Sequence, residues 1–230
     1  MDMSFAERFA FNFIDDKRWT YIADGLKVTL QITFLALLIG IVLGFVLAIV
    51  RSTYLKTGKL KLLNLIAQIY ITVIRGTPVV VQLLIIYFVI FGMVNVSKIL
   101  AAVMAFGMNS AAYVAEIVRS GIMSIDDGQF EAGRSLGFNY FQTMIYIVLP
   151  QAFKNILPAL GNEFIVLLKE TSVAGYIAIQ DLTKGGDIIR SRTYDAMFPL
   201  LTVAVIYLVM VMIFSKLVNM LERRLRNSDH

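Results

Sequence analysis

Uncharged runs long enough to cross a bilayer restrict most strongly what this chain can fold into. Residues 28–50, between Lys27 and Arg51, contain no charged side chain, and neither do residues 196–215, between Asp195 and Lys216. A hydrocarbon core of about 30 Å needs roughly 20 helical residues. Hydrophobic side chains make up 58% of the chain and charged ones 16%, whereas soluble domains have roughly 45–50% and about 25%. The runs are therefore predicted to be membrane spans.

Composition also excludes several kinds of active site. The chain has no cysteine, and its single histidine is His230 at the C-terminus. It therefore offers no thiolate or imidazole cluster for zinc, iron or copper, no disulfide, and no Ser/His/Asp or Cys/His arrangement for nucleophilic catalysis. The net charge of +5 is expected to reflect cytoplasmic anchoring residues and not nucleic-acid binding.

Hydropathy predicts an all-α polytopic membrane protein with five transmembrane helices in a single domain over residues 1–230. The predicted spans cover about residues 24–50, 62–93, 98–119, 156–179 and 195–221. In the first span, Gly40 and Gly44 have a small-xxx-small spacing that would let another helix approach closely. The fourth span contains Glu163, Lys169 and Glu170. Each central charge costs roughly 2.5–3.5 kcal/mol, so this helix must lie inside a bundle and not against lipid.

The second span contains a potential break, which consists of Arg75, Gly76, Thr77 and Pro78. Proline and glycine interrupt the helical hydrogen-bond ladder, and freed backbone groups at membrane depth must be buried in protein or line a watery cavity. Two interpretations remain open. The four residues form a cavity element, or residues 62–74 are a surface helix that leads into a span beginning at Val79.

Short loops predict the orientation of the chain. The loop from Arg51 to Lys61 holds four basic residues and no acidic one, whereas residues 92–98 hold one basic residue. The positive-inside rule then places the first loop and residues 116–154 in the cytoplasm, together with the C-terminal Arg223, Arg224 and Arg226. We expect a multi-pass protein of the cell (inner) membrane, with the N-terminus outside and lipid around the bundle.

The cytoplasmic segment, about residues 122–154, is predicted to form a helix-turn-helix finger. Ser124 followed by Asp127 has capping-box spacing, which predicts a helix that continues to Leu136. Gly137 could supply the left-handed turn after it, and Asn139 could cap a second helix.

That second helix is expected to run from Tyr140 to about Tyr146 and to stop before Pro150. On the first arm, Ala132 and Gly133 are expected to be exposed, because small side chains there would permit close docking into a groove of a partner. Gly128, Gly133, Arg134 and Ser135 imitate a phosphate-binding loop. The imitation lacks the lysine and the preceding strand, so we expect no ATP site in this chain.

Ordered motifs in residues 75–182 resemble one family of transport proteins. Glu131-Ala132-Gly133, followed after three residues by Gly137 and after nine more by Ile147-Val148-Leu149-Pro150, resembles the EAA loop in the membrane subunits of binding-protein-dependent ABC importers. Gly133 stands in place of the second alanine. The stretches at residues 75–82, 112–116, 128–129, 149–152 and 168–172 are similar to the polar amino-acid branch of that family.

The resemblance implies a type I importer permease, which is a transport subunit and not an enzyme. It implies two cytosolic ABC ATPase subunits that bind ATP and Mg, so this chain itself would hold no cofactor. Further implied partners are a second permease subunit, either a second copy or a related chain, and an extracytoplasmic solute-binding protein. The residues that would couple the finger to the ATPase and thereby alternate access are Glu131, Ala132, Gly133 and Gly137.

Polar residues inside the membrane indicate which amino acid is carried. Lys169 lies about 240° around the helix from Glu163, so it does not readily neutralise that carboxylate. A buried carboxylate without a partner is costly, whereas one that faces a watery cavity can receive a cation. We therefore predict that Glu163 binds the side chain of a basic amino acid. The neutral hydrogen-bonding groups expected around the ligand belong to Asn162, Ser110 and Tyr113.

Other interpretations of these charges remain open. Arg75 or a residue of the partner subunit could pair permanently with Glu163. Arg75, Lys169 and Glu170 are expected to support the helix break and to pair internally. The alternative functions are a permease for acidic or amide amino acids, a secondary transporter, and an intramembrane enzyme that uses Glu163 and Glu170 as acid and base.

Overall fold

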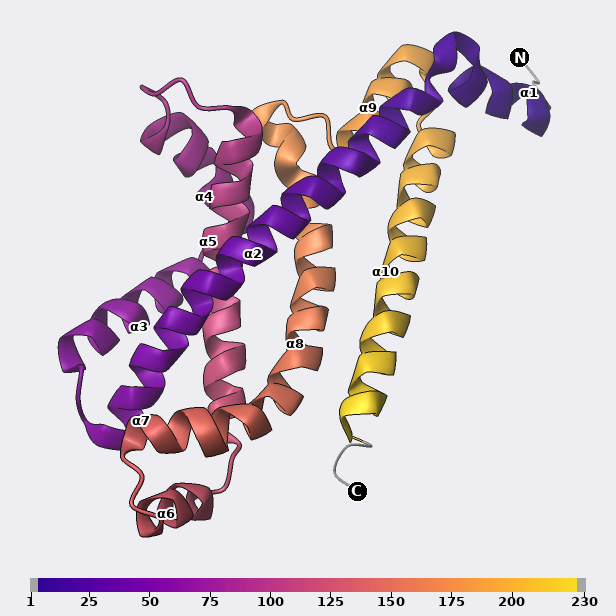
Figure 1. Ribbon diagram of the computed structural model, residues 1–230. Helices are drawn as coiled ribbons and strands as arrows, with labels where there is room; N and C mark the ends of the chain where they lie inside the picture. The colour runs from indigo at the N-terminus through magenta and orange to yellow at the C-terminus, as the bar shows by residue number, and fades with distance from the viewer. Residues whose placement is uncertain (1–3, 227–230) are drawn as a thin grey trace.

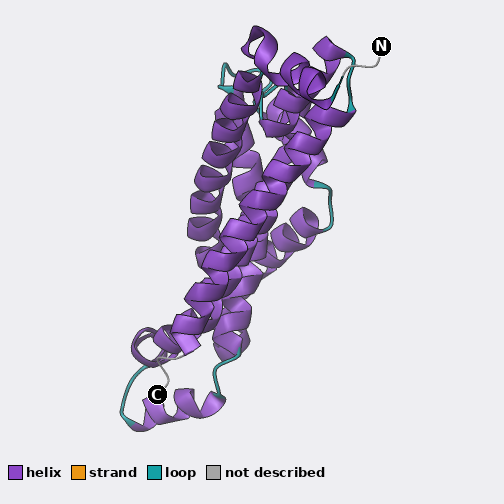
Figure 2. Ribbon diagram, turned by 90° about the vertical axis from the view of Figure 1, so that its right-hand side faces the viewer, coloured by secondary structure: helices purple, strands orange, loops and turns teal. Residues whose placement is uncertain are grey.

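The computed structural model describes residues 4–226, so His230 lies outside the described residues, as does the side chain of Arg226. Within that range the structure contains helices and no strand, arranged as an elongated bundle (Figures 1 and 2). The helices are α1 (Phe5–Phe9), α2 (Trp19–Thr57), α3 (Lys61–Arg75), α4 (Val79–Leu84), α5 (Lys98–Met123), α6 (Asp127–Ser135), α7 (Tyr140–Thr143), α8 (Leu149–Glu170), α9 (Leu182–Thr193) and α10 (Met197–Arg226). Three π-helical segments, Ala10–Ile14, Ile85–Ile90 and Met144–Val148, and two 3-10 segments, Asp15–Lys17 and Thr171–Ile177, adjoin them.

Long apolar helices dominate the fold, as the uncharged runs predict. Among the described residues, four segments are long and apolar enough to cross a membrane: Trp19–Thr57, Lys98–Met123, Tyr140–Ile177 and Met197–Leu225. A fifth crossing results if α3 and Val79–Ile90 are counted together, because this pair is bent by 107° at the predicted break. The predicted number of five spans therefore depends on the bent pair. The third predicted span, residues 98–119, corresponds to α5, which extends to Met123.

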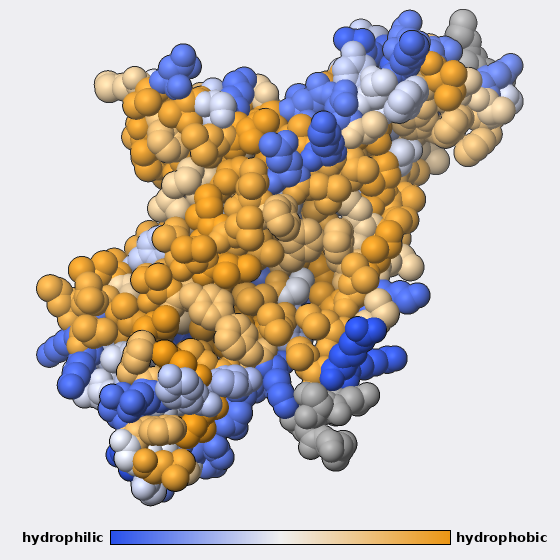
Figure 3. All heavy atoms as spheres, viewed as in Figure 1, coloured by the Kyte–Doolittle hydropathy of each residue, from blue (hydrophilic) through white to orange (hydrophobic). Residues whose placement is uncertain are grey.

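The outer surface of the bundle is suited to lipid. In Figure 3 hydrophobic residues cover the middle of the molecule, and hydrophilic ones gather at its two ends. Large apolar side chains of α2 and α10 point outward, such as Val42 at 64% and Leu208 at 58% exposure. A soluble protein would not leave contiguous surface of this kind uncovered.

Close packing of α2 against α5 forms the centre of the bundle. A Cβ atom on Gly40 would lie 2.8 Å from Ser110 Oγ, and one on Gly44 would lie 2.6 Å from Val114 Cβ. The small-xxx-small spacing therefore serves a contact within the chain, where the missing side chains let the two helices approach. Buried residues of both helices, including Ile32, Ala36 and Phe106, continue this core.

The predicted start of the finger at Ser124 is wrong. Ser124 still belongs to the end of α5, where its hydroxyl donates to the carbonyl of Gly121 at 2.8 Å. The cap of α6 is Asp126, whose Oδ1 accepts from the backbone N–H of Gly128 at 2.7 Å. Two residues only two positions apart had cap chemistry, and the end of the preceding helix decided between them.

The predicted stop before Pro150 is also wrong. The chain passes from α7 through the π-helical segment Met144–Val148 directly into α8, and Pro150 lies in the first turn of α8. A π-helical turn shifts the hydrogen-bond pattern, and a proline in a first turn sacrifices no bond that the helix needs. The far end of α8 stops at Glu170, and a tighter 3-10 segment covers the rest of the fourth predicted span.

Two elements at the end of the molecule opposite α6 were not predicted. α9 follows Asp181, whose carboxylate accepts from the backbone N–H groups of Thr183 and Lys184 and so caps the helix. The arm before α2 folds back on the start of α10, where Arg8 and Asn12 donate to Asp195 at 2.9 and 3.0 Å. Both elements depend on contacts between residues far apart in the sequence.

Candidate functional site

The buried carboxylate of Glu163 lies between α8 and α5. Ser110 Oγ donates to Glu163 Oε1 at 2.8 Å, and the two side chains are 0% and 6% exposed respectively. Among the described residues, Glu163 makes no ion pair. The structure thus brings together two of the residues that the sequence predicted for one site, and it provides a neutral hydroxyl as the partner of the acid.

The other two predicted ligand residues lie nearby but do not hydrogen-bond to Glu163 within the described part of the chain. Asn162 is exposed, and its Nδ2 donates back to the carbonyl of Pro158 at 3.2 Å. Tyr113 is half-buried beneath Arg75, whose Cζ lies 5.2 Å from the centroid of the tyrosine ring. The permanent Arg75–Glu163 pair that the sequence left open is therefore not present.

The helix break is supported by residues that the sequence analysis missed. Arg75, Gly76, Thr77 and Pro78 are all exposed. Gln82 reaches back from α4, and its Nε2 lies 2.8 Å from the carbonyl oxygen of Ile74 and 3.1 Å from that of Thr77. These are backbone groups that the break would otherwise leave without partners.

Asn109 of α5 completes this support. Its Nδ2 donates to Gln82 Oε1 at 3.0 Å, and both side chains are buried. Two amides separated by 27 positions gave no local sequence signal. The support expected from Lys169 and Glu170 is not seen. Lys169 is exposed and Glu170 half-buried at the end of α8, and neither forms an ion pair in the residues that the structure describes.

A cavity of about 510 Å³, lined in part by charged side chains, opens next to the helix break, toward the end of the bundle that carries α6. Glu116 on its wall receives Arg51 on one carboxylate oxygen and Arg119 Nη2, at 2.8 Å, on the other. The wall of this cavity includes Arg75, Glu116, Ile117, Arg119, Asn155 and Ala159. Between residues 4 and 226, no three His, Cys, Asp or Glu side chains gather to hold a metal ion.

The finger is a compact hairpin of α6 and α7 at the same end of the bundle. Gly137 has φ +82°, which supplies the predicted left-handed turn. Asn139 forms a full capping box with Gln142 at the start of α7. Glu131 and Ala132 are exposed, as a docking surface requires.

The expected exposure of Gly133 is wrong. This glycine is buried against the second arm, where an added Cβ would lie 2.5 Å from Thr143 Oγ1. The glycine in place of alanine therefore lets the two arms of the hairpin approach, and the small surface available to a partner is that of Ala132.

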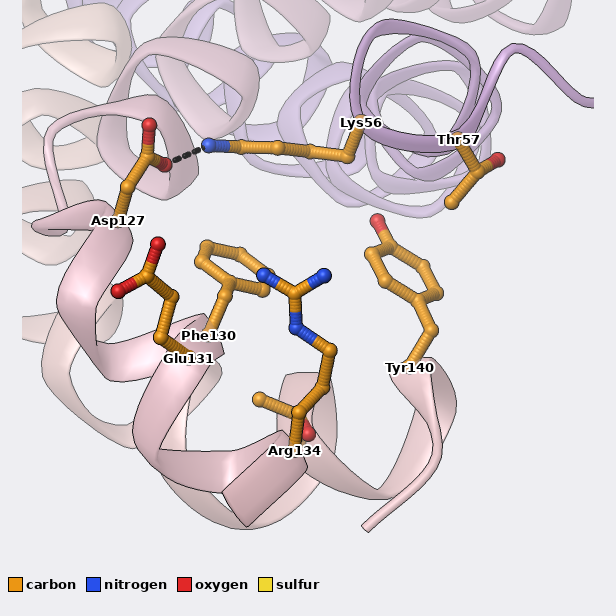
Figure 4. A pocket seen from close by; sticks show the side chains of 8 residues that line it. Lys56, Thr57, Asp127, Phe130, Glu131, Arg134 and Tyr140 are labelled. Carbon is orange, nitrogen blue, oxygen red and sulfur yellow. Dashed lines mark hydrogen bonds and ion pairs between the residues drawn. The ribbon is translucent and has the colours of Figure 1, made fainter.

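The C-terminal end of α2 holds the finger. Lys56 forms an ion pair with Asp127, and its ammonium lies 4.7 Å from the ring centroid of Phe130 (Figure 4). Phe130 in turn stacks on Tyr140 at 6.2 Å. A cavity of about 330 Å³ lies among these side chains and those of Glu131 and Arg134. The finger is thus tied to a helix that crosses the membrane, so a force on one can move the other.

Comparison with known proteins agrees with this architecture. The family described as binding-protein-dependent transport system inner membrane component matches residues 40–227. The arginine transport system permease protein ArtQ of Bacillus subtilis is 39% identical over 91% of this chain and 94% of its own. The glutamine transport system permease protein GlnP of Escherichia coli is 37% identical over 89% of this chain and 93% of its own.

Solved structures agree as well. A chain from the crystal structure of an amino acid ABC transporter with histidines superimposes with a TM-score of 0.83 and 47% identity, over 92% of this chain and 98% of that one. A chain of the MetNI methionine ABC transporter, in an inward-facing conformation, has a TM-score of 0.78 over 90% of this chain and 97% of that one. At 20% identity this second match indicates a shared fold alone.

Proposed function

The chain belongs to the family of binding-protein-dependent transport system inner membrane components, and from that premise we propose that it forms the translocation pathway of an importer for basic amino acids. It is an amino-acid ABC permease subunit and not an enzyme. The proposal concerns which amino acid is carried, which residues bind it, and how this chain meets the ATPase.

The burial of Glu163 carries the proposal for a basic substrate. Its carboxylate is 6% exposed, and its hydrogen-bond partner is the neutral hydroxyl of Ser110. A charge in this position costs free energy unless a cation joins it. The names of the relatives include arginine, glutamine and histidines. Among these substrates, a cationic side chain suits an uncompensated carboxylate best.

The cavity supports access to this site from the cytoplasm. Ala159 lines the cavity, and Glu163 lies one helical turn further along the same face of α8. Ile117 also lines it, and Ser110 lies two turns away on the same face of α5. Both stripes lead from the inner end of the bundle toward the carboxylate, and exposed Asn162 borders the same stripe.

Replacing Glu163 with glutamine tests the substrate. The glutamine side chain could still accept the Ser110 hydrogen bond but would carry no charge. In the reconstituted importer with its ATPase and binding protein, Glu163→Gln should reduce kcat/KM for arginine and lysine at least tenfold, an effect of about 1.4 kcal/mol. Glu222→Gln, at an exposed carboxylate of α10, is the matched control. Unchanged uptake of basic amino acids by an equally expressed Glu163→Gln importer would rule out the ligand role.

We also propose that the finger couples this chain to a cytosolic ABC ATPase. The exposed Glu131 and Ala132 would contact the ATPase, while Gly133 and Gly137 would shape the hairpin that presents them. ATP and Mg would bind to that partner. The absence of native cysteine makes single-cysteine crosslinking simple. Cysteines at positions 131 and 132 should capture the ATPase in the native assembly, and a cysteine at Tyr194 should not. Failure at both finger positions would contradict the coupling role.

The remaining partners complete the proposal. A second permease subunit, identical or related, would cover the exposed break at residues 75–78 and exposed Asn162, because a polar face of this kind does not suit lipid. An extracytoplasmic solute-binding protein would deliver the amino acid at the end that carries α9. Residues 1–230 would then act as one transmembrane domain, with the N-terminus outside and the finger and C-terminus in the cytoplasm.

A further inference from the structure

One arginine on the cavity wall has no acidic partner. Of the side chains that line the cavity, Glu116 carries the one carboxylate, and its two oxygens are taken by Arg51 and Arg119. Among residues 4–226, Arg75 makes no ion pair, although it lies on the same wall. Arg51, Arg75 and Arg119 thus surround a single carboxylate, so this wall keeps a net positive charge, and Arg75 is the arginine that is not ion-paired to it.

The contact that Arg75 does make leaves its hydrogen-bond donors available. Its guanidinium lies over the ring of Tyr113 at 5.2 Å. This cation–π contact does not use the N–H groups as hydrogen-bond donors, and within the described residues the N–H edge of the guanidinium makes no hydrogen bond. That edge matches a carboxylate in bidentate geometry. The side chain is exposed beside the helix break, so the edge can be reached.

Tyr113 also sets the spacing between this cation and the buried acid. Ser110, which donates to Glu163, precedes Tyr113 by three residues on α5. Three residues are nearly one turn, or about 5 Å along the helix. The residue of α5 that contacts the positive group and the residue that contacts the negative group therefore lie about one turn apart. A basic amino acid has the complementary pattern, with a carboxylate at one end, a cation at the other and methylene groups between.

We infer that Arg75, stacked on Tyr113, binds the α-carboxylate of the substrate at the end of the site opposite Glu163. The inference rests on the proposed function, because it takes Glu163 as the site of the side-chain cation. It adds a residue that recognises the part common to all amino acids. Since Arg75 lines the cytoplasmic cavity and Glu163 lies deeper, the bound amino acid would point its carboxylate toward the cytoplasm.

Arginine and two of its analogues, agmatine and citrulline, test the two ends of the proposed site independently. Agmatine is arginine without its carboxylate, and citrulline is arginine with a neutral side chain. Binding is measured by calorimetry on the permease–ATPase complex without the binding protein, whose own selectivity would mask the result. The wild-type complex should bind arginine at least tenfold more tightly than agmatine. In Arg75→Gln this ratio should fall to within about twofold, while the preference for arginine over citrulline remains. In Glu163→Gln, the preference for arginine over citrulline should be lost, while the preference for arginine over agmatine remains.

The controls distinguish a failed inference from a failed variant. Arg192→Gln removes another arginine that stacks on a tyrosine, Tyr21 at 5.0 Å, and should keep the wild-type arginine-to-agmatine ratio. Arg75→Lys retains the charge without the planar face and should give an intermediate ratio. The inference would be overturned if the wild-type complex bound arginine and agmatine about equally. It would also be overturned if both Arg75 variants kept the wild-type preference for arginine over agmatine.

Failure of the proposed function gives a different pattern. If the wild-type complex does not prefer arginine over citrulline, the side chain is not recognised as a cation. The carboxylate is then tested with citrulline against its decarboxylated analogue, N-carbamoylputrescine. Loss of that discrimination in Arg75→Gln would still support the carboxylate assignment, and its retention would overturn it.

Discussion

At the scale of single residues, backbone contact decides where a side chain is forbidden. A Cβ atom on Gly25 would lie 2.5 Å from the backbone oxygen of Asp181, and backbone atoms cannot swing aside. We expect Gly25→Ala to destabilise the protein by about 1–3 kcal/mol. Gly175→Ala is the matched control, because its nearest atoms lie at an ordinary 3.4 Å. Thermal unfolding in detergent measures both, and equal midpoints would contradict the packing argument.

The acid at the same contact makes stability depend on pH. Burial raises the pKa of Asp181 to about 6 from 3.8, opposed in part by the N–H bonds of Lys184 and Thr183. Because the folded state keeps this proton longer than the unfolded state, its contribution to stability is complete below pH 4 and is lost as the pH rises through 6. A pKa difference of this size corresponds to about 3 kcal/mol.

Asp181→Asn isolates this effect, since asparagine also caps helices but does not ionise. The variant should be more stable than the wild type at pH 7, and the difference should shrink toward pH 4. Unfolding midpoints of the two proteins, compared at each pH, cancel the titration of other carboxylates. A difference that is constant from pH 4 to pH 7 would show that Asp181 does not titrate in this range.

At the scale of elements, the hairpin of α6 and α7 depends on one close contact. Gly133→Ala should push the arms apart, because its Cβ would meet both Oγ1 and Cγ2 of Thr143. Thr143→Ala removes those two atoms, and it should cost little because Thr143 Oγ1 has no hydrogen-bond partner among the described residues. We expect Gly133→Ala to lower transport-coupled ATPase activity severalfold and the double variant to regain most of it.

A double-mutant cycle measures this recovery as a coupling energy between the two positions. Ser135→Ala, at an exposed position of α6, raises helix propensity in the same direction and is the control for that effect. If Gly133→Ala and the double variant lose the same activity, the contact between the arms does not set the position of the finger.

The elements that the sequence predicted correctly are those fixed by local pattern. Long uncharged runs gave the first and last of the four long spans, hydropathy gave the other two, and Gly137 and Asn139 gave the turn and the cap of the finger. The wrong or missing predictions concern two cases: nearby residues that could each cap the same helix, and contacts between residues far apart in the sequence. The N-cap of α6 is Asp126 and not Ser124, because Ser124 is the C-cap of α5. No local sequence pattern predicts that Gln82 and Asn109 together support the helix break.

At the scale of the whole molecule, the two ends differ in what they offer. One end carries α1, the loop after the π-helical segment Ile85–Ile90, and α9, and the other carries α6 and the last turns of α10 (Figure 1). α1 and the end of α10 therefore lie at opposite ends, which is the arrangement that an odd number of crossings requires. Of the proposed substrate site, the sequence predicted the contact partners Glu163 and Ser110, which the structure brings together. The sequence contains no sign of the contact between Arg75 and Tyr113, because that contact exists only in three dimensions.

Orientation in the membrane can be tested at these two ends, because the chain has no native cysteine. Met93, Tyr194 and Leu136 are 101%, 95% and 71% exposed, so a cysteine at each should react readily. A membrane-impermeant maleimide added to intact cells should label positions 93 and 194, and it should label position 136 after permeabilisation alone. The opposite labelling pattern would place the finger outside the cell, where it could not contact a cytosolic ATPase. Both the predicted topology and the proposed coupling role would then be wrong.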